Sequence, residues 1–234
     1  TTLYSALKQI NTPDVNIMTA EDPVEFNFDG INQVAVRSGI GLTFAASLRS
    51  FLRQDPDIIM VGEIRDTETA EIAIRAALTG HLVFSTIHTN DAPSTVSRLT
   101  DMGIPPFLVA SSTRLIMAQR MIRKICQSCK KEVEVDDDTL IKLGVPEDQV
   151  ADFKVYDGVG CSDCNDTGMS GRTGIFEVML VSPMMEKMIL DKATVPEIRA
   201  QAIKEGMLTL RHAALAKLRK GITNIQEVMS KSSE

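Results

Sequence analysis

The stretch Asp55–Asp66 (DPDIIMVGEIRD) constrains the fold more than any other part of this chain. A turn at its start is followed by five apolar residues, Ile58–Gly62, and then by Glu63. A short, unbroken apolar run between turn signals is typical of a strand buried within a parallel sheet. Ligands of open α/β sheets bind beyond the carboxyl ends of such strands. Glu63 is placed either to hold Mg²⁺ or a water beside a nucleotide phosphate, or to open the next helix as a solvated side chain.

Two further apolar runs end on polar side chains in the same way. The runs are Val15–Ala20 and 81–88, and the polar residues at or just after their ends are Glu21, Asp22, Glu25 and His88. Taken singly, each group is a polar turn or a structural histidine. Because three such runs alternate with helical segments, we predict that their polar ends gather at one sheet edge and form a nucleotide site.

The segments between these strands have the period of helices. Thr43–Gln54 and Thr67–Thr79 place apolar residues on one face, and Thr43 and Asp66 stand at their N-cap positions. Residues 1–10 show the same period. Alternation of strands and helices predicts parallel pairing through crossover helices.

The second half of the chain is predicted to be mixed and then helical. The expected elements are helices over Asp91–Met102, Phe107–Arg120 and Asp138–Leu143, a strand near Phe153–Tyr156, turns over Gly168–Gly174, a strand over Ile175–Leu180, and short helices over Met184–Leu190, Pro196–Glu205, Leu208–Lys220 and Ile225–Met229. Capping-box patterns begin at Thr194 and at Thr223. The glycine spacing in 168–174 does not fit a phosphate-binding loop.

Four cysteines form two C-x₂-C pairs, Cys126 with Cys129 and Cys161 with Cys164. In a chain that we expect not to be secreted, this pattern favours a metal over disulfides. Each pair can chelate a metal from a tight turn, and two pairs complete a closed tetrahedral four-sulfur site. We therefore predict a structural Zn²⁺. The alternative is four reduced thiols packed as small hydrophobic side chains.

Length and charge narrow the range of functions. The 234 residues suffice for an α/β domain with small appendages. We expect a core over 1–120, a tetracysteine zinc-binding subdomain over 121–180 and a C-terminal helical subdomain over 181–234. A net charge of −6 and an aromatic content of 4%, without Trp, argue against a nucleic-acid partner. No apolar run has the length of a membrane span.

Several stretches together resemble the C-terminal half of the hexameric ATPases of the secretion superfamily. They are TTLYSAL, AEDPVE, LRSFLRQDPDIIMVGEIRD, TGHLVFSTIHTND, the two cysteine pairs and GRTGIFEV, spread over nearly the whole chain. The resemblance is greatest to the branch that assembles type IV pili, and next to the type II secretion branch. It implies an α/β, RecA-like P-loop ATPase core, with a parallel-rich sheet flanked by helices, that hydrolyses ATP with Mg²⁺.

The resemblance also implies roles for individual residues. These are the acidic box Glu21, Asp22 and Glu25, the Walker B acid Glu63, the coupling histidines His81 and His88, and Thr1, Arg49, Arg53 and Arg65 near the nucleotide or a subunit interface. Glu21 is the expected activator of water and Glu63 the expected organiser of Mg²⁺, although the two roles could be exchanged. Arg49 and Arg53 lie four residues apart on one helix face, where they are either solvated or charge clamps for a phosphate.

One motif of the family is absent from the sequence. Its P-loop, G-x-x-x-x-G-K-[ST], belongs directly before Thr1. That loop supplies the backbone amides and the lysine that hold the β- and γ-phosphates. We therefore expect that the chain comes from a longer protein and cannot hydrolyse ATP by itself.

Two classes of function remain open. The first is a homo-hexameric motor that acts on a platform protein of the bacterial inner membrane, is held at its cytoplasmic face through partners, and binds no nucleic acid. It would power type IV pilus assembly or, alternatively, type II secretion; residues 137–144 and the stretch GCSDCNDTGMSGRTGIFEV resemble the pilus branch. The second is a zinc-ribbon module that docks protein or nucleic acid without chemistry, using the basic stretch Arg114–Lys131.

Overall fold

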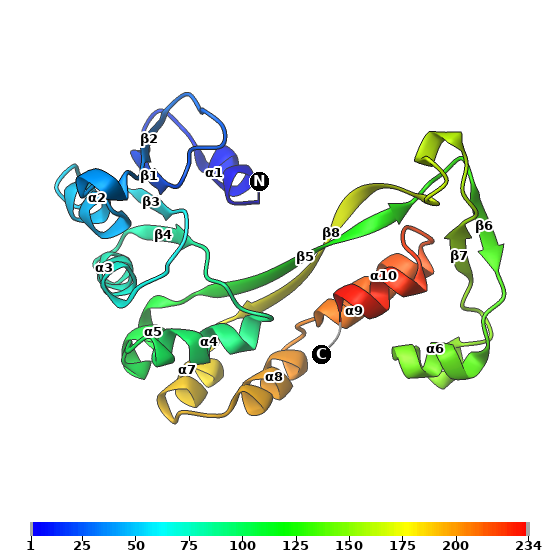
Figure 1. The fold of residues 1–234 in the computed structure, drawn as a ribbon. Helices are drawn as coiled ribbons and strands as arrows, with labels where there is room; N and C mark the ends of the chain where they lie inside the picture. The colour runs from blue at the N-terminus through cyan, green and yellow to red at the C-terminus, as the bar shows by residue number, and fades with distance from the viewer. Residues whose placement is uncertain (1, 233–234) are drawn as a thin grey trace. The chain divides into compact units, whose positions relative to one another are not determined.

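The computed structural model describes residues 2–232, and these form two compact units (Figure 1). Of the described residues, unit 1 contains 2–89, 94–114 and 181–198, and unit 2 contains 90–93, 115–180 and 199–232. The predicted division into three domains, with boundaries at residues 120 and 180, stays a prediction. The boundaries of the two units fall at other residues.

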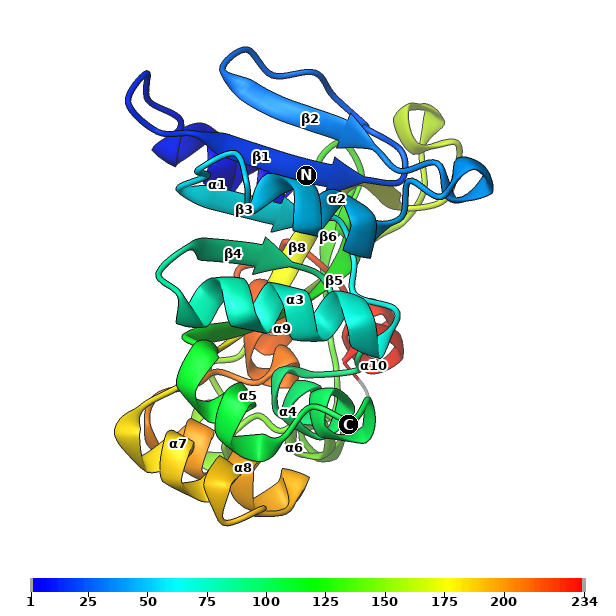
Figure 2. The same ribbon diagram turned by 90° about the vertical axis from the view of Figure 1, so that its left-hand side faces the viewer.

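Unit 1 is built on a parallel sheet with the strand order β2-β1-β3-β4 (Figure 2). The strands are β1 (Ile17–Glu21), β2 (Ile31–Ala35), β3 (Ile58–Val61) and β4 (Leu82–Ser85). All of β3 is buried, as expected for a strand that is covered on both faces. The register pairs Ala20 with Val61 and Val61 with Ser85, so three carboxyl ends meet at one edge. The predicted α/β class with a parallel sheet is confirmed.

Helices cover both faces of this sheet. The helices concerned are α1 (Thr2–Ile10) on one face, and α2 (Phe44–Phe51) and α3 (Thr67–Leu78) on the other. Because successive side chains of a strand point to opposite faces, Ile58 and Met60 pack with α1, whereas Ile59 and Val61 pack with α2 and α3. This double coverage explains the unbroken apolar run in the sequence of β3.

The remaining helices of unit 1 lie outside the sheet. α5 (Pro106–Ser112) packs against α7 (Pro183–Leu190). α4 (Ala92–Asp101) begins within unit 2 and continues in unit 1, and α8 (Val195–Lys204) runs from unit 1 into unit 2. The predicted helix over Asp91–Met102 is thereby confirmed.

Asp66 caps α3 as the sequence predicts. Its Oδ1 accepts the Thr69 N–H at 2.8 Å, and its Oδ2 accepts the Thr69 hydroxyl at 2.9 Å. We expect Asp66→Ala to lower the free energy of unfolding by about 1 kcal/mol, because an N–H of the first turn loses its acceptor. Denaturant unfolding measures this change. Asp66→Asn is the matched control and should cost much less, since Asn caps as well as Asp; equal losses in both variants would contradict the capping role.

Unit 2 is an antiparallel structure with its own core. Its elements are β5 (Leu115–Ile125) paired with β8 (Met169–Leu180), β6 (Lys130–Val133) paired with β7 (Val155–Gly158), α6 (Asp137–Leu143), α9 (Leu210–Arg219) and α10 (Ile225–Lys231). The core joins Ile122 and Ile175 of the β5–β8 pair to Leu140 of α6, Leu218 of α9 and Val228 of α10. The cysteines form a separate buried cluster.

The predicted helix over Phe107–Arg120 is wrong beyond its first half. The helix ends at Ser112, and the chain then enters β5. Leu, Met, Ala, Gln and Arg in this stretch are good helix formers, which favoured the helical interpretation. The antiparallel partner β8, more than 40 residues further along the chain, overrides that preference, and Ile116 and Ile122 become the buried positions of a strand.

Two smaller predictions are also corrected. The glycine-rich stretch predicted as turns belongs to β8 from Met169 onward, since it is held in the ladder by β5. The last helix is capped by Asn224, which accepts the Glu227 N–H at 3.0 Å, and not by Thr223. The Thr223 hydroxyl instead donates to the Arg123 carbonyl at 2.9 Å, so it is already engaged.

Candidate functional site

Three predicted site residues lie at the carboxyl ends of neighbouring strands. Glu21 is the last residue of β1, Glu63 comes two residues after β3, and His88 comes three residues after β4. The Thr86 hydroxyl donates to the Gly62 carbonyl at 2.7 Å, which ties the chain beyond β4 to the chain beyond β3. The sheet edge thus carries two carboxylates and an imidazole, as the sequence predicts.

The Glu63 carboxylate is held by two nitrogen-bearing side chains. One oxygen forms an ion pair with Arg65, and the other lies 3.3 Å from Nε2 of His88. The Glu63 side chain is 14% exposed, and that of Arg65 is 61% exposed. The hydrogen bond from Arg65 is the main cause that lowers the pKa of Glu63, and the same contact raises the pKa of Arg65. An ionised carboxylate in this place fits a hard cation such as Mg²⁺.

Glu21 is more deeply buried than Glu63. It is 3% exposed, and its carboxylate accepts hydrogen bonds from Tyr4, from the Thr19 hydroxyl at 2.5 Å and from Gln33 Nε2 at 3.0 Å. A buried carboxylate is costly unless its oxygens are satisfied, and here both are. Desolvation, together with the Glu21 carboxylate, raises the pKa of the Tyr4 hydroxyl, so it remains a donor.

The other acidic and histidine predictions lie in different places. Asp22 and Glu25 are exposed in the loop after β1. His81 lies at the amino end of β4, with Nδ1 2.9 Å from the Ala76 carbonyl at the end of α3. The structure therefore does not bring His81 to the edge that carries the two carboxylates. Thr1 lies outside the described residues.

The three predicted arginines also differ in surroundings. Arg49 forms a 2.6 Å ion pair with Glu68, and both side chains are at least half exposed. Arg53 donates to the Arg49 carbonyl at 2.8 Å, so these two belong to the outer surface of α2. Arg65 is the arginine of this set that contacts a predicted catalytic carboxylate, Glu63.

The four cysteines meet at one point in unit 2. Their sulfurs all lie within 4.8 Å of one another, with Cys126–Cys161 and Cys129–Cys164 at 3.8 Å. Those distances are far from the roughly 2.05 Å of a disulfide bond. Zn–S bonds of about 2.3 Å give sulfur–sulfur edges of about 3.8 Å in a regular tetrahedron. The cluster therefore has the spacing that one tetrahedral metal ion requires.

The thiols differ in electrostatic setting. Burial raises the pKa of Cys129 to about 12, and burial also raises the pKa of Cys161. Burial acts on Cys164 in the same direction, but N–H donors from Cys161 and Gly168 outweigh it and hold the pKa at about 7. Amide donors to sulfur are typical surroundings of a thiolate ligand.

Glycine is required where the chain closes around this cluster. An added Cβ at Gly158 would overlap the backbone of Gly168, and one at Gly168, which has φ +70°, would overlap Gly158. The Gly168 N–H donates to Cys164 at 3.2 Å, and its carbonyl accepts the Cys126 N–H at 2.9 Å. One glycine thus joins the two cysteine pairs through its backbone.

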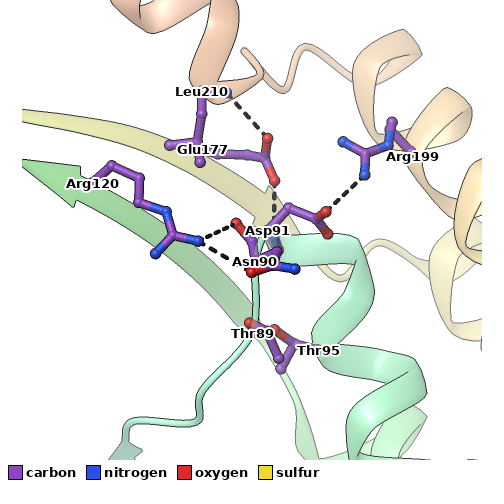
Figure 3. A network of polar contacts seen from close by, with 9 residues as sticks. Thr89, Asn90, Asp91, Thr95, Arg120, Glu177, Arg199 and Leu210 are labelled. Atoms are coloured by element: carbon purple, nitrogen blue, oxygen red, sulfur yellow. Dashed lines mark hydrogen bonds and ion pairs between the residues drawn. The ribbon is translucent and has the colours of Figure 1, made fainter. Parts of the chain in front are cut away.

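A second polar cluster, which the sequence did not reveal, lies in unit 2 (Figure 3). Glu177 is 1% exposed; one oxygen accepts the Ala92 N–H at 2.8 Å and the other accepts the N–H of the first residue of α9 at 3.2 Å. Arg199 donates to Asp91 at 2.8 Å. These contacts anchor residues 90–93, which directly follow the His88 loop in the sequence.

None of the helices among residues 2–232 is both long and apolar enough to cross a membrane.

Comparison with known proteins places these features in a family. The family described as Type II/IV secretion system protein matches residues 1–230. The chain is 57% identical, over its full 234 residues, to the type IV pilus assembly ATPase PilB of Myxococcus xanthus (strain DK1622), and covers 41% of that protein. It is 44% identical over its full length to the type II secretion system ATPase E of Vibrio cholerae serotype O1, and covers 46% of it.

A solved structure supports the same relationship. The crystal structure of the pilus retraction motor PilT with bound ADP aligns with 100% of this chain and 57% of its own, with a TM-score of 0.71 and 27% identity. The chain spans less than half the length of the curated ATPases it matches. The structural match agrees with the α/β fold and the parallel sheet described above. The chain belongs to the family of Type II/IV secretion system proteins.

Proposed function

We propose that this chain is the C-terminal part of an ATPase motor that powers type IV pilus assembly. The observation that carries the proposal is the sheet edge, where Glu21, Glu63 and His88 follow three neighbouring parallel strands. Carboxylates at this edge can serve transfer of a phosphoryl group to water. The chemistry requires ATP and Mg²⁺, and an upstream P-loop that holds the phosphates.

The two glutamates have separate roles in this proposal. Glu63, whose pKa is lowered by its contact with Arg65, would hold Mg²⁺ or the waters bound to it. Mg²⁺ supplies neutralisation of the phosphate charge when it is bound. Glu21 polarises the attacking water, and His88 senses the γ-phosphate through its contact with Glu63. The roles of Asp22, Glu25, His81, Arg49 and Arg53 stay predictions.

The assembly and its place in the cell are part of the same proposal. The motor is a homo-hexamer at the cytoplasmic face of the inner membrane, where it acts on a platform protein. The four cysteines hold a structural Zn²⁺, which fixes two turns of unit 2 and offers no open coordination position for chemistry. The zinc-ribbon binding module is the weaker alternative, because it leaves the buried, satisfied Glu21 without a role.

We prefer pilus assembly to type II secretion because the sequence identity to the pilus assembly relative is higher. The chain is 57% identical to a type IV pilus assembly ATPase and 44% identical to a type II secretion system ATPase. Expression of the full-length protein in a Myxococcus xanthus strain without its PilB tests the preference. We expect surface pili to return; restored type II secretion in a Vibrio cholerae strain without its ATPase E, with no pili in the first strain, would favour the alternative.

ATP hydrolysis tests the motor itself. We expect no Mg²⁺-dependent hydrolysis by residues 1–234 alone, because the phosphates lack the P-loop amides and lysine. The chain extended upstream through its P-loop and preceding domain should hydrolyse ATP, and Glu21→Gln should lower kcat by at least about 100-fold, as expected for loss of a general base. Full activity of Glu21→Gln would contradict the role of Glu21, and turnover by the short chain would contradict the need for the P-loop.

A further inference from the structure

Glu21 and the loop that follows β1 share two side chains that bind both of them. Tyr4 of α1 donates its hydroxyl hydrogen to Glu21, and the same hydroxyl oxygen accepts the Glu25 N–H at 3.2 Å. Tyr4 therefore links the buried carboxylate to the middle of the loop. Asp22 and Glu25, which the family resemblance predicts to be site residues, both belong to this loop.

Gln33 of β2 makes a second link of the same kind. Its Nε2 donates to Glu21 Oε1 at 3.0 Å and to the Phe26 carbonyl at 2.9 Å, while its Oε1 accepts the Phe28 N–H at 2.8 Å. One side-chain amide thus uses both donors and its acceptor on the carboxylate and the loop. Gln33 therefore links Glu21 to the part of the loop at Phe26 and Phe28, just as Tyr4 links Glu21 to the middle of the loop at Glu25.

Ring packing adds to these hydrogen bonds. The Tyr4 ring stacks on Phe28 with centroids 5.3 Å apart and meets Phe26 edge-on at 5.8 Å. Tyr4 is 8% exposed, so its ring is fixed and only one hydroxyl orientation can serve both Glu21 and the Glu25 N–H. A side chain with so little freedom is suited to hold a reacting group in place.

We infer that Tyr4 and Gln33 are positioning residues that hold the Glu21 carboxylate and the loop of residues 22–29 in one arrangement. The inference rests on the proposed role of Glu21 in hydrolysis. Tyr4 belongs to α1 and Gln33 to β2, so two elements that flank β1 hold the carboxylate to which the proposed function assigns the activation of water.

The positioning is tested first without nucleotide, on residues 1–234. Tyr4→Phe keeps the ring and removes the hydroxyl, so amide hydrogen exchange should become faster at Glu25. Gln33→Leu should have the same effect at Phe28. The matched control is Tyr156→Phe, the same change at the other tyrosine of the chain, which lies in unit 2 under Lys130. Unchanged exchange at Glu25 and Phe28 in the variants would overturn the inference.

The catalytic consequence is tested in the chain extended through its P-loop. We expect Tyr4→Phe to lower kcat at least about tenfold, the size of one lost hydrogen bond to a charged group, with the KM for ATP almost unchanged. In the Glu21→Gln background the same change should lower the residual rate much less, because Tyr4 acts through Glu21. Tyr156→Phe should leave kcat unchanged.

The outcomes separate the two proposals. If Glu21→Gln leaves hydrolysis intact, the role of Glu21 is wrong and the catalytic part of the inference fails with it. If Glu21→Gln abolishes hydrolysis but Tyr4→Phe has no effect on kcat, or has an equal effect in both backgrounds, the positioning role alone is wrong. A melting temperature of Tyr4→Phe close to that of the parent excludes simple unfolding as the cause of a lower kcat.

Discussion

Cys126→Ser is expected to weaken zinc binding by more than about 100-fold, since even groups that only support a metal ligand contribute 10–100-fold. The region Cys126–Cys164 should then lose its order, because binding of a structural metal is coupled to the folding of its site. The parallel sheet of unit 1 should stay folded, since the cysteines form a cluster of their own and contribute nothing to its core. Zinc content per chain and amide hydrogen exchange measure the two effects.

Ser128→Ala is the matched control within the same turn. Ser128 donates to Asp163 at 2.6 Å, between the two cysteine pairs, but offers no sulfur to a metal. We expect it to keep one zinc per chain and to alter exchange only slightly. If Cys126→Ser also unfolded β1–β4, the metal would stabilise more than the region around the cysteines, and its proposed local role would be wrong. If the parent protein and Cys126→Ser both held no zinc and were equally stable, the cysteines would be reduced thiols packed as hydrophobic side chains.

The sheet edge could be predicted from sequence because its signals are local. Ile58–Val61 is a continuous apolar run, and a strand that is buried on both faces requires apolar residues at nearly every position. Once parallel pairing is inferred, the position of Glu63 follows from geometry alone. The cysteine pairs are equally local, since each C-x₂-C turn already carries half of a tetrahedral site.

What the sequence did not reveal depends on partners that are distant along the chain. β5 reads as a helix until β8 is known to pair with it. Tyr4 and Glu21 are 17 residues apart, and no short-range pattern joins them. Glu177 offered one signal, because it alternates with Ile175 and Met179 on the buried side of β8 and therefore had to point inward.

Glu63→Gln is expected to lower kcat for ATP hydrolysis by roughly 100-fold or more in the chain extended through its P-loop. A carboxylate that organises Mg²⁺ supports several kcal/mol of transition-state stabilisation, and each 1.4 kcal/mol is about a factor of ten in rate. Glutamine keeps the shape of the side chain but loses the charge that attracts the cation. Steady-state hydrolysis measured over a range of Mg²⁺ concentrations should show the loss even where Mg²⁺ is in excess.

Stability should change far less than activity in this variant. The contacts that Glu63 loses are with Arg65 and His88, whose side chains are 61% and 89% exposed, and ion pairs with exposed partners contribute about 1 kcal/mol at most. Glu71→Gln is the matched control, since Glu71 forms a surface ion pair with Arg75 within α3 and contacts neither Glu21 nor Glu63, and this variant should keep full activity. Equal kcat values for the two variants would remove Glu63 from the reaction and leave its pairing with Arg65 and His88 as a structural feature of the sheet edge.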